Sequence, residues 1–197
     1  MRVFLAGATG VIGVRVAPLL VAAGHTVAGM TRTPAKAPEL RGLGVQPVVC
    51  DVFDLDALRG AVTAFDPDLV MHQLTDLPDD LAQIGDYRER NDRIRLQGTR
   101  NLLAAAADAG VTRLIAQSIA WKLPGKRGES TAAFERLVLD AGGVVIRYGQ
   151  LYGPQTFYPD APPPPPRVHV DQAARATVPL LDADPGIVEV VEGDDAP

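Results

Sequence analysis

The stretch FLAGATGVIG, residues 4–13, joins a hydrophobic run to three glycines spaced three residues apart, Gly7, Gly10 and Gly13. The run ends a predicted buried strand, and residues 10–23 carry apolar side chains at helical spacing. Glycines between a strand and a helix permit a tight turn, close approach of a ligand to the backbone, and close packing of helix on strand. The stretch predicts a phosphate-binding loop at a helix N-terminus, with a glycine-rich turn that holds no ligand as the alternative.

Strand and helix patterns alternate along the first 150 residues. Continuous Val, Leu and Ile runs predict strands at 2–6, 25–31, 45–50, 69–72, 111–117 and 144–148. Helical patterns follow at 55–65, 81–109 and 131–141. Apolar strands separated by helices are typical of a parallel sheet that is covered on both faces. Right-handed crossovers then give an α/β fold, a doubly wound parallel sheet of Rossmann-like type.

The end of the second predicted strand bears on the ligand. The glycine cluster, placed between strand and helix, predicts a dinucleotide whose pyrophosphate lies at the helix N-terminus. An acidic residue after the second strand would hydrogen-bond the ribose 2′-hydroxyl of NAD. This chain has Thr31, Arg32 and Thr33 there, with Lys36 close behind. Because a guanidinium forms charge-assisted bonds with a 2′-phosphate, the sequence favours NADP(H) over NAD(H), although a lone exposed arginine is more often a solvated charge.

The chain changes character after Pro154. Five consecutive prolines at 162–166 favour an extended connector and exclude a helix. A strand at 168–170, a helix at 171–181 and a last strand at 187–191 follow. We expect residues 1–154 to form the NAD(P)-binding domain. Residues 155–197 are expected to supply a connector and a short strand-helix-strand that completes the same domain.

Composition limits the classes of function. The chain has 197 residues, 47% of them hydrophobic and 22% charged, as in an ordinary globular protein. A net charge of −5 does not favour nucleic acid or an anionic membrane as a partner. The single cysteine, Cys50, excludes an internal disulfide and fits a reducing compartment. With neither a signal-peptide pattern nor a long apolar span, we expect a cytoplasmic protein without a metal site.

Several motifs, in the same order, resemble the extended and atypical branch of the short-chain dehydrogenase/reductase superfamily, the NAD(P)-dependent epimerase/dehydratase group. The motifs are GATGVIG (7–13), CDVFD (50–54), NDRIRLQGTRNLLAAAADAGVTRLIAQS (91–118), RYGQLYGP (147–154) and VHVDQAARA (168–176). They cover nearly the whole chain. The resemblance implies the doubly wound fold and a bound nicotinamide dinucleotide.

The resemblance also assigns roles to particular residues. It implies that Asp51 and Val52 contact the adenine, and that the segment after the fourth strand passes beside the cofactor ribose. Ser118 matches the active-site serine, and Tyr152 lies in the loop near the nicotinamide. The expected cofactor-binding residues are Gly7, Thr9, Gly10, Val11, Ile12, Gly13, Thr31, Arg32, Asp51, Val52, His72, Gln73, Leu74, Tyr148 and Tyr152. The expected catalytic residues are Ser118 and Tyr152.

Each of these assignments has a simpler alternative. Asp51 would serve equally as a cap of the following helix. His72 would serve as a hydrogen-bonded histidine at a strand end, and Ser118 as a polar loop residue. Tyr148 would serve as a core residue whose hydroxyl is bonded elsewhere.

The chain departs from the family pattern where the family carries its catalytic Tyr and Lys. Aligning FERLVL (134–139) places Arg127 and Thr131 at those two positions. Arginine does not release its proton, and threonine carries no charge. Only 13 residues, 155–167, stand where the family carries a sizeable substrate domain. The resemblance therefore implies an intact cofactor half and a strongly shortened C-terminal substrate region.

The expected function is an NADP(H)-binding atypical reductase that passes hydride to a small acceptor, a flavin, a quinone or a carbonyl. Ser118 would polarise the acceptor, and Tyr152 or solvent would supply the proton. One alternative is a regulator that binds the redox nucleotide without chemistry, and another is a sugar-nucleotide epimerase or dehydratase. The expected partner is a small-molecule substrate, and the resemblance leaves open a homodimer formed through the long helix and the helix after the fifth strand.

Overall fold

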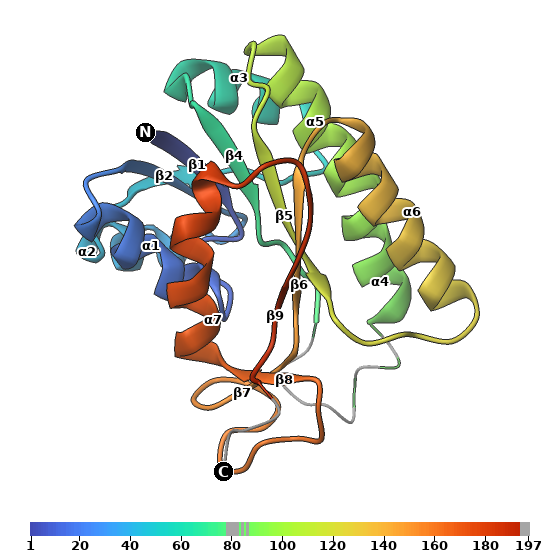
Figure 1. The fold of residues 1–197 in the computed structure, drawn as a ribbon. Helices are drawn as coiled ribbons and strands as arrows, with labels where there is room; N and C mark the ends of the chain where they lie inside the picture. The colour runs from blue at the N-terminus through green and yellow to red at the C-terminus, as the bar shows by residue number, and fades with distance from the viewer. Residues whose placement is uncertain (78–82, 84, 86, 194–197) are drawn as a thin grey trace.

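The computed structural model describes residues 1–77, 83, 85 and 87–193 (Figure 1). Within these residues, seven parallel strands form one sheet in the order β3-β2-β1-β4-β5-β6-β9. The strands are β1 (Arg2–Ala6), β2 (Thr26–Thr31), β3 (Gln46–Val49), β4 (Leu69–His72), β5 (Leu114–Ile119), β6 (Val144–Tyr148) and β9 (Gly186–Val190). The order of strands reverses between β1 and β4. In open α/β sheets, ligands bind beside the carboxyl ends of the strands at such a point.

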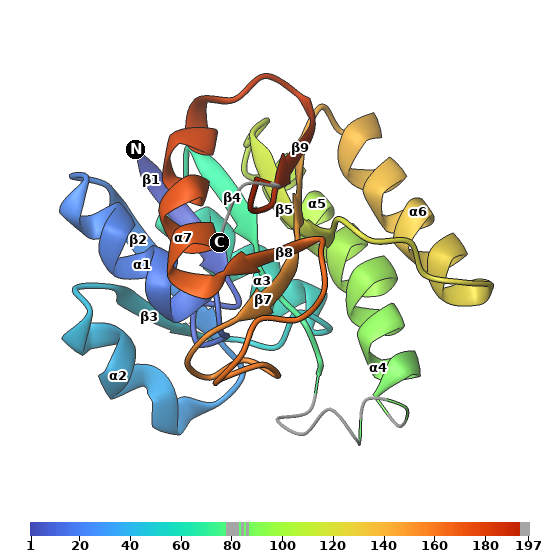
Figure 2. The same cartoon turned by 60° about the horizontal axis from the view of Figure 1, so that its bottom comes forward.

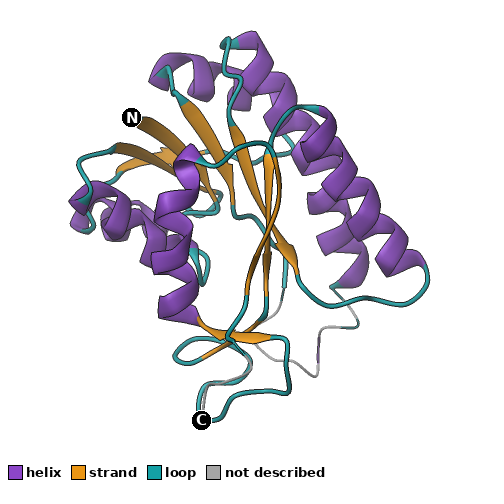
Figure 3. Cartoon of the chain, viewed as in Figure 1, coloured by secondary structure: helices purple, strands orange, loops and turns teal. Residues whose placement is uncertain are grey.

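Helices cover both faces of the sheet, as Figures 1 and 3 show. One face carries α1 (Gly13–Ala22), α2 (Ala37–Gly42) and α7 (Val170–Thr177). The other face carries α3 (Leu55–Phe65), α5 (Thr99–Asp108) and α6 (Lys126–Asp140). The remaining helical segments are η1 (Pro34–Lys36), α4 (Arg88–Arg93), the π-helical η3 (Ile94–Gly98) and η4 (Val178–Asp182). The expected doubly wound α/β fold is confirmed.

Two hydrophobic clusters lie on the two faces of the sheet. Leu5 of β1 packs in one cluster with Leu20 of α1. Its neighbour Phe4 packs in the other with Leu102 of α5 and Phe134 of α6. Successive side chains of a strand point to opposite faces, so one short strand contributes to both clusters. This double burial explains why the strands appear in the sequence as continuous apolar runs.

A second, two-stranded sheet lies beyond the end of β6, where Figure 2 brings it to the front. It pairs β7 (Gln150–Tyr152) with β8 (Arg167–His169) in parallel, with Tyr152 opposite His169. The strand expected at 168–170 is β8, and β7 was not expected. A Cβ on Gly149 would lie 2.6 Å from the Arg167 carbonyl carbon, so this approach of the two segments needs glycine.

Several element boundaries differ from those expected. Helix α6 begins at Lys126, not at residue 131, and Gly128 lies in its first turn, where a Cβ would meet the Leu123 carbonyl oxygen at 2.3 Å. Strand β5 begins at Leu114, not at residue 111. The residues before it close the C-terminus of α5, where Gly110 has φ 72° and Val111 N–H donates to the Ala106 carbonyl at 2.8 Å.

Two further segments differ from the expected helices. Helix α2 and the preceding η1 were not expected, although prolines are tolerated in the first turn of each. The long helix expected at 81–109 is described from residue 88 as α4, η3 and α5 in succession. Its expected start, at 81–86, lies largely outside the described residues.

Candidate functional site

The three glycines after β1 differ in the room around them. Gly7 has φ 89°, and a Cβ there would lie 2.6 Å from the Gln73 carbonyl group. A Cβ on Gly13 would lie 2.1 Å from the Gly7 carbonyl oxygen, so the loop itself excludes any side chain at these two positions. The corresponding contact at Gly10 is 3.3 Å, also to the Gly7 oxygen. Gly10 is exposed, and it is therefore the glycine of the three that the protein's own packing requires least.

A cavity of about 210 Å³ opens beside this loop, at the carboxyl ends of β1 to β4. Most of the expected cofactor-binding residues line it, namely Gly7, Thr9, Gly10, Thr31, Arg32, Asp51, Val52, Gln73 and Leu74. The other lining residues are Met30, Thr33, Lys36, Cys50, Thr75 and Ile94. Segments from four strand ends therefore meet at the reversal of strand order, the place where ligands bind in open α/β sheets.

The cavity's rim at the end of β2 is rich in hydroxyls and cations. The Thr31 and Thr9 hydroxyl oxygens lie 3.3 Å apart, and Thr33 N–H donates to the Thr31 hydroxyl. The Arg32 guanidinium reaches across to Asp76, at 3.2 Å between Nη2 and Oδ1. Lys36 lines the same rim. The lining of this corner therefore carries hydroxyls and cations, which suit an anionic group, and one of the cations is paired with Asp76.

Asp51 does not cap the helix that follows it. Its carboxylate accepts the Phe53 N–H at 2.9 Å, whereas Asp54 caps α3 by accepting the Ala57 N–H at 3.1 Å. The neighbouring Val52 is buried, and its carbonyl accepts a hydrogen bond from Asn101 Nδ2 at 2.8 Å. These bonds hold the loop after β3 against the cavity.

His72 ends β4 with both ring nitrogens engaged. Leu74 N–H donates to Nδ1 at 3.2 Å, and Nε2 lies 3.1 Å from the Thr99 hydroxyl oxygen. Complete burial, together with the charge of Arg95, lowers the pKa of His72 to about 4. The histidine is therefore neutral at physiological pH, and its contacts match the alternative of a hydrogen-bonded histidine at a strand end.

Ser118 donates its proton to a carboxylate. Its Oγ lies 2.6 Å from Oε1 of the buried Glu135 on α6, which also accepts two bonds from Arg147 on β6, at 2.9 and 2.7 Å. Burial opposes ionisation of Glu135, but the bonds from Arg147 and Ser118 outweigh it and lower the pKa of this carboxyl. A hydroxyl has one proton, so Ser118 in this arrangement offers a substrate only lone pairs.

Tyr152 is engaged in a similar way. Its hydroxyl donates to Glu192, whose other oxygen accepts from Arg167 Nε at 3.1 Å. The bond to Glu192 raises the pKa of Tyr152, so the phenol holds its proton more tightly than a free tyrosine. Its ring packs edge-on against His169 at 5.1 Å between centroids.

The other expected residues lie in the core or beside it. Tyr148 is buried, its hydroxyl lies 2.6 Å from the Thr177 hydroxyl, and burial raises the pKa of Tyr148 to about 12. Ile12 belongs to the same core cluster, and Val11 packs against it. On α6, Thr131 accepts a bond from Arg95 Nη1 at 2.7 Å and donates to the Arg127 carbonyl. Neither Arg127 nor Thr131 offers an acid or a base.

Sequence reasoning missed the charged partners of these groups. Asp76, Glu135 and Glu192 were not singled out, although each bonds a residue that was. The partners lie 17 to 44 residues away along the chain. A local signal existed only for Asp76, because it follows β4 closely and so lies at the same sheet edge as the glycine loop.

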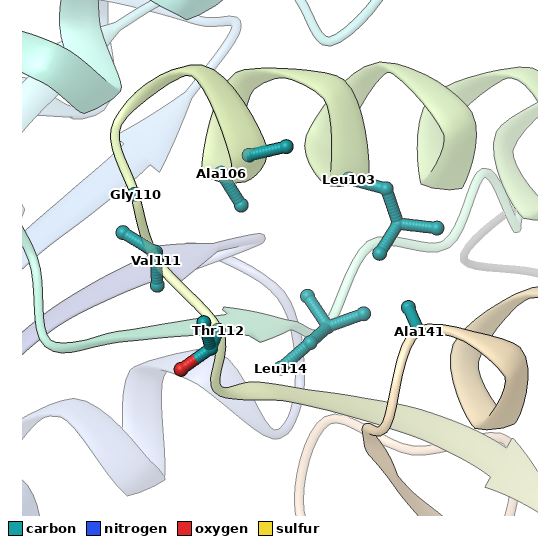
Figure 4. A pocket seen from close by; sticks show the side chains of 8 residues that line it. Leu103, Ala106, Gly110, Val111, Thr112, Leu114 and Ala141 are labelled. Atoms are coloured by element: carbon teal, nitrogen blue, oxygen red, sulfur yellow. The ribbon is translucent and has the colours of Figure 1, made fainter.

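A second cavity, of about 500 Å³, is shown in Figure 4. It is lined by Leu103, Ala106, Ala107, Gly110, Val111, Thr112, Leu114 and Ala141. These residues surround the amino end of β5, at the sheet edge opposite the glycine loop. The lining is nearly all apolar, without the donor groups of the first cavity.

Comparison with known proteins identifies the family to which the chain belongs. The sequence profile of the NAD(P)H-binding family matches residues 7–141, so the chain belongs to that family. The fold is similar to that of the UDP-glucose 4-epimerase of Thermus thermophilus in complex with NAD, with a TM-score of 0.80 and 23% identity. That match covers 98% of this chain and 78% of the epimerase. The expected resemblance to the epimerase/dehydratase group is confirmed at the level of fold.

Two curated relatives are similar in sequence. A 3-diazoavenalumate denitrifying reductase of a Streptomyces species is 39% identical over 189 residues, a match that covers 80% of this chain and 59% of the reductase. A 3-beta-hydroxysteroid dehydrogenase of Mycolicibacterium neoaurum is 29% identical over 114 residues, covering 58% of this chain and 31% of the dehydrogenase. The chain thus spans less than two thirds of either relative. Among the described residues, none of the helices has the length and apolar character needed to cross a bilayer.

Proposed function

We propose that this protein is an NADP(H)-dependent reductase that passes hydride to a small acceptor needing no proton from the protein. One observation carries the proposal. The two hydroxyls best placed by sequence to serve an acceptor, those of Ser118 and Tyr152, each donate to a carboxylate that an arginine also holds. With both hydroxyls bonded in this way, Ser118 and Tyr152 can orient reactants, but neither offers a proton as a general acid.

The cavity beside the glycine loop would hold the cofactor. Gly7, Gly10 and the N-terminus of α1 would face the pyrophosphate, where the helix dipole favours negative charge. Arg32, with the Thr31 hydroxyl, would contact the 2′-phosphate. The other contacts would come from Thr9 at the loop, from Asp51 and Val52 toward the adenine, and from Gln73 and Leu74 toward the ribose.

Because neither of these two hydroxyls is a free proton donor in the described part of the chain, the range of suitable acceptors is narrower. A carbonyl develops an oxyanion on hydride attack and needs a donor at that point. A flavin or a quinone takes its proton from water after hydride transfer. An arenediazonium ion needs none: hydride adds to the carbon that bears nitrogen, the C–N bond breaks, dinitrogen leaves with the electron pair, and NADPH becomes NADP⁺.

The relative with 39% identity supports a diazo acceptor, because its name describes a denitrifying reductase of a diazo compound. We therefore rank an aromatic diazo compound first among acceptors, quinones and flavins second, and carbonyls third. Sugar nucleotides rank last. Their epimerisation needs an acid/base group, and Arg127 and Thr131 supply none.

The test is NADPH oxidation by purified protein against a panel of one arenediazonium salt, a quinone, a free flavin, small carbonyls and nucleotide sugars. With the diazonium salt, dinitrogen release is measured in parallel and must equal NADPH consumed. A Gly10→Val protein serves as the control for uncatalysed reduction. Turnover of carbonyls or nucleotide sugars in preference to the diazonium salt and quinone would overturn the proposal.

The same hydrogen bonds also fit a second function, a regulator that binds the redox nucleotide without chemistry. With the hydroxyls of Ser118 and Tyr152 bonded to Glu135 and Glu192, binding of the nucleotide would need no acceptor. Tight NADPH binding with no turnover across the panel would favour this function over the reductase.

A further inference from the structure

Asp76 lies between two arginines at the edge of the cofactor cavity. Its side chain is only 8% exposed, whereas those of Arg32 and Arg90 are 56% and 50% exposed. Arg32 follows β2 and lines the cavity, and Arg90 belongs to α4. Two cations therefore share one nearly buried carboxylate, and one of them is the residue proposed to bind the 2′-phosphate.

The two arginines hold the carboxylate unequally. Arg90 approaches as a fork, with Nε 3.0 Å from Oδ2 and Nη2 3.1 Å from Oδ1. Arg32 lies at 3.2 and 3.5 Å from the same two oxygens, the second beyond ordinary hydrogen-bond length. The contact of Arg32 is therefore the one more easily exchanged.

Helix α4 fixes the position of Asp76 and Arg90. The Asn91 Oδ1 atom accepts the Asp76 backbone N–H at 3.2 Å, and the Arg90 guanidinium lies over the Tyr87 ring at 4.4 Å. Both the backbone and the carboxylate of Asp76 are thus attached to the same helix. Arg32 belongs to a different segment, the end of β2, and of these three residues only Arg32 lines the cavity.

We infer that Asp76 and Arg90 determine cofactor specificity by controlling the release of Arg32. Asp76 competes with the 2′-phosphate for Arg32, and Arg90 keeps Asp76 paired when Arg32 turns to the phosphate. A nearly buried carboxylate left without a cation is costly, so release is favourable only while Arg90 remains. The inference rests on the proposed preference for NADP(H), and it assigns that preference to a cluster of three residues.

The experiment compares dissociation constants of NADPH and NADH by titration for the wild-type protein and four variants. Arg90→Met is expected to lower the NADH-to-NADPH ratio of dissociation constants on the order of tenfold, because Arg32 becomes the remaining arginine on Asp76. Asp76→Asn removes the competing charge and should raise the ratio several-fold. Arg88→Met, an exposed arginine of the same helix, is the matched control and should leave the ratio unchanged.

Arg32→Met separates the inference from the proposed function. If Arg32→Met leaves the ratio unchanged, the proposed NADP(H) preference itself fails. If Arg32→Met lowers the ratio and Arg90→Met matches the Arg88→Met control, only the inference fails. A ratio lowered by Asp76→Asn would also overturn it, because Asp76 would then orient Arg32 rather than compete for it. Thermal melting of each variant establishes that the folded protein is compared.

Discussion

The two ends of the proposed site differ in how their polar groups are used. At the glycine loop, Gly10 is exposed and the side chain of Arg32 is 56% exposed, although its guanidinium also meets Asp76, so a ligand can reach both residues. Near the ends of β5 and β7, the hydroxyls of Ser118 and Tyr152 are already bonded to Glu135 and Glu192. The first region retains what binding a dinucleotide needs. In the second region the two hydroxyl protons are held by carboxylates that Arg147 and Arg167 also bind.

This difference teaches that cofactor binding and acid/base chemistry are separable on this fold. Binding depends on backbone geometry close to β1, which the chain's own packing enforces at Gly7 and Gly13. Acid/base chemistry depends on a few side chains whose protons must be free. The two requirements fall on different elements of the sheet, so one can be met without the other.

The largest expected effect is at the glycine loop. Gly10→Val places a branched side chain where the pyrophosphate would lie, and we expect NADPH binding to weaken about 100-fold or more, or about 2.7 kcal/mol. The fold should persist, because the contact of a Cβ here is 3.3 Å and not the 2.1 Å of Gly13. Fluorescence titration and urea unfolding measure the two effects. Retained affinity in a folded variant would place the phosphates elsewhere.

The region around Ser118 is tested by the substitution Glu135→Gln. Removing the charge leaves Arg147 partly unpaired, and we expect about 2–3 kcal/mol less stability at pH 7, below the full cost of a broken buried pair because Arg147 is partly exposed. The pKa of Glu135 is lowered by folding, so this stability is present above the pKa of the unfolded chain and is lost as pH falls through the folded value. Urea unfolding over a range of pH should show a loss that shrinks in acid. An unchanged midpoint at neutral pH would contradict it.

His72 lies between the two regions, and its titration gives a third test. Its pKa is lowered to about 4 in the folded protein, so below its ordinary value of 6.5 the unfolded chain binds the proton first. Stability is therefore lost on acidification from about pH 6.5, by about 2 kcal/mol at about pH 5. His72→Asn removes this contribution. The difference in unfolding free energy between wild type and variant should change with pH by that amount, and a constant difference would count against neutral His72.

The smallest expected effect is that of Ser118→Ala on turnover. If Ser118 donated to a developing oxyanion, its loss would lower the rate by about 10²–10³-fold. Because its proton is held by Glu135, we expect less than about a tenfold loss with the best acceptor of the panel. Steady-state rates with saturating NADPH measure it. A loss of two orders of magnitude would mean that Ser118 turns to the substrate during reaction.

The prediction of the fold succeeded where the signal was local. The central strands of the sheet were recognisable because burial on both faces requires uninterrupted apolar runs, as in Leu69–His72. Helix α2 was missed because it is only six residues long and begins beside prolines. The start of α6 was missed because Gly128 is unfavourable in a helix unless packing demands it, which it does against Leu123.

The sequence by itself determined the glycine loop, the alternation of strand and helix, and the basic residues after β2, because these depend on neighbours within a few positions. Only the tertiary structure decided what each polar group bonds. Arg32 meets Asp76 across 44 residues, Ser118 meets Glu135 across 17, and Tyr152 meets Glu192 across 40. The sequence shows that a serine or tyrosine hydroxyl can donate a proton. Whether that proton is free depends on which carboxylate the packing of sheet and helices brings beside it.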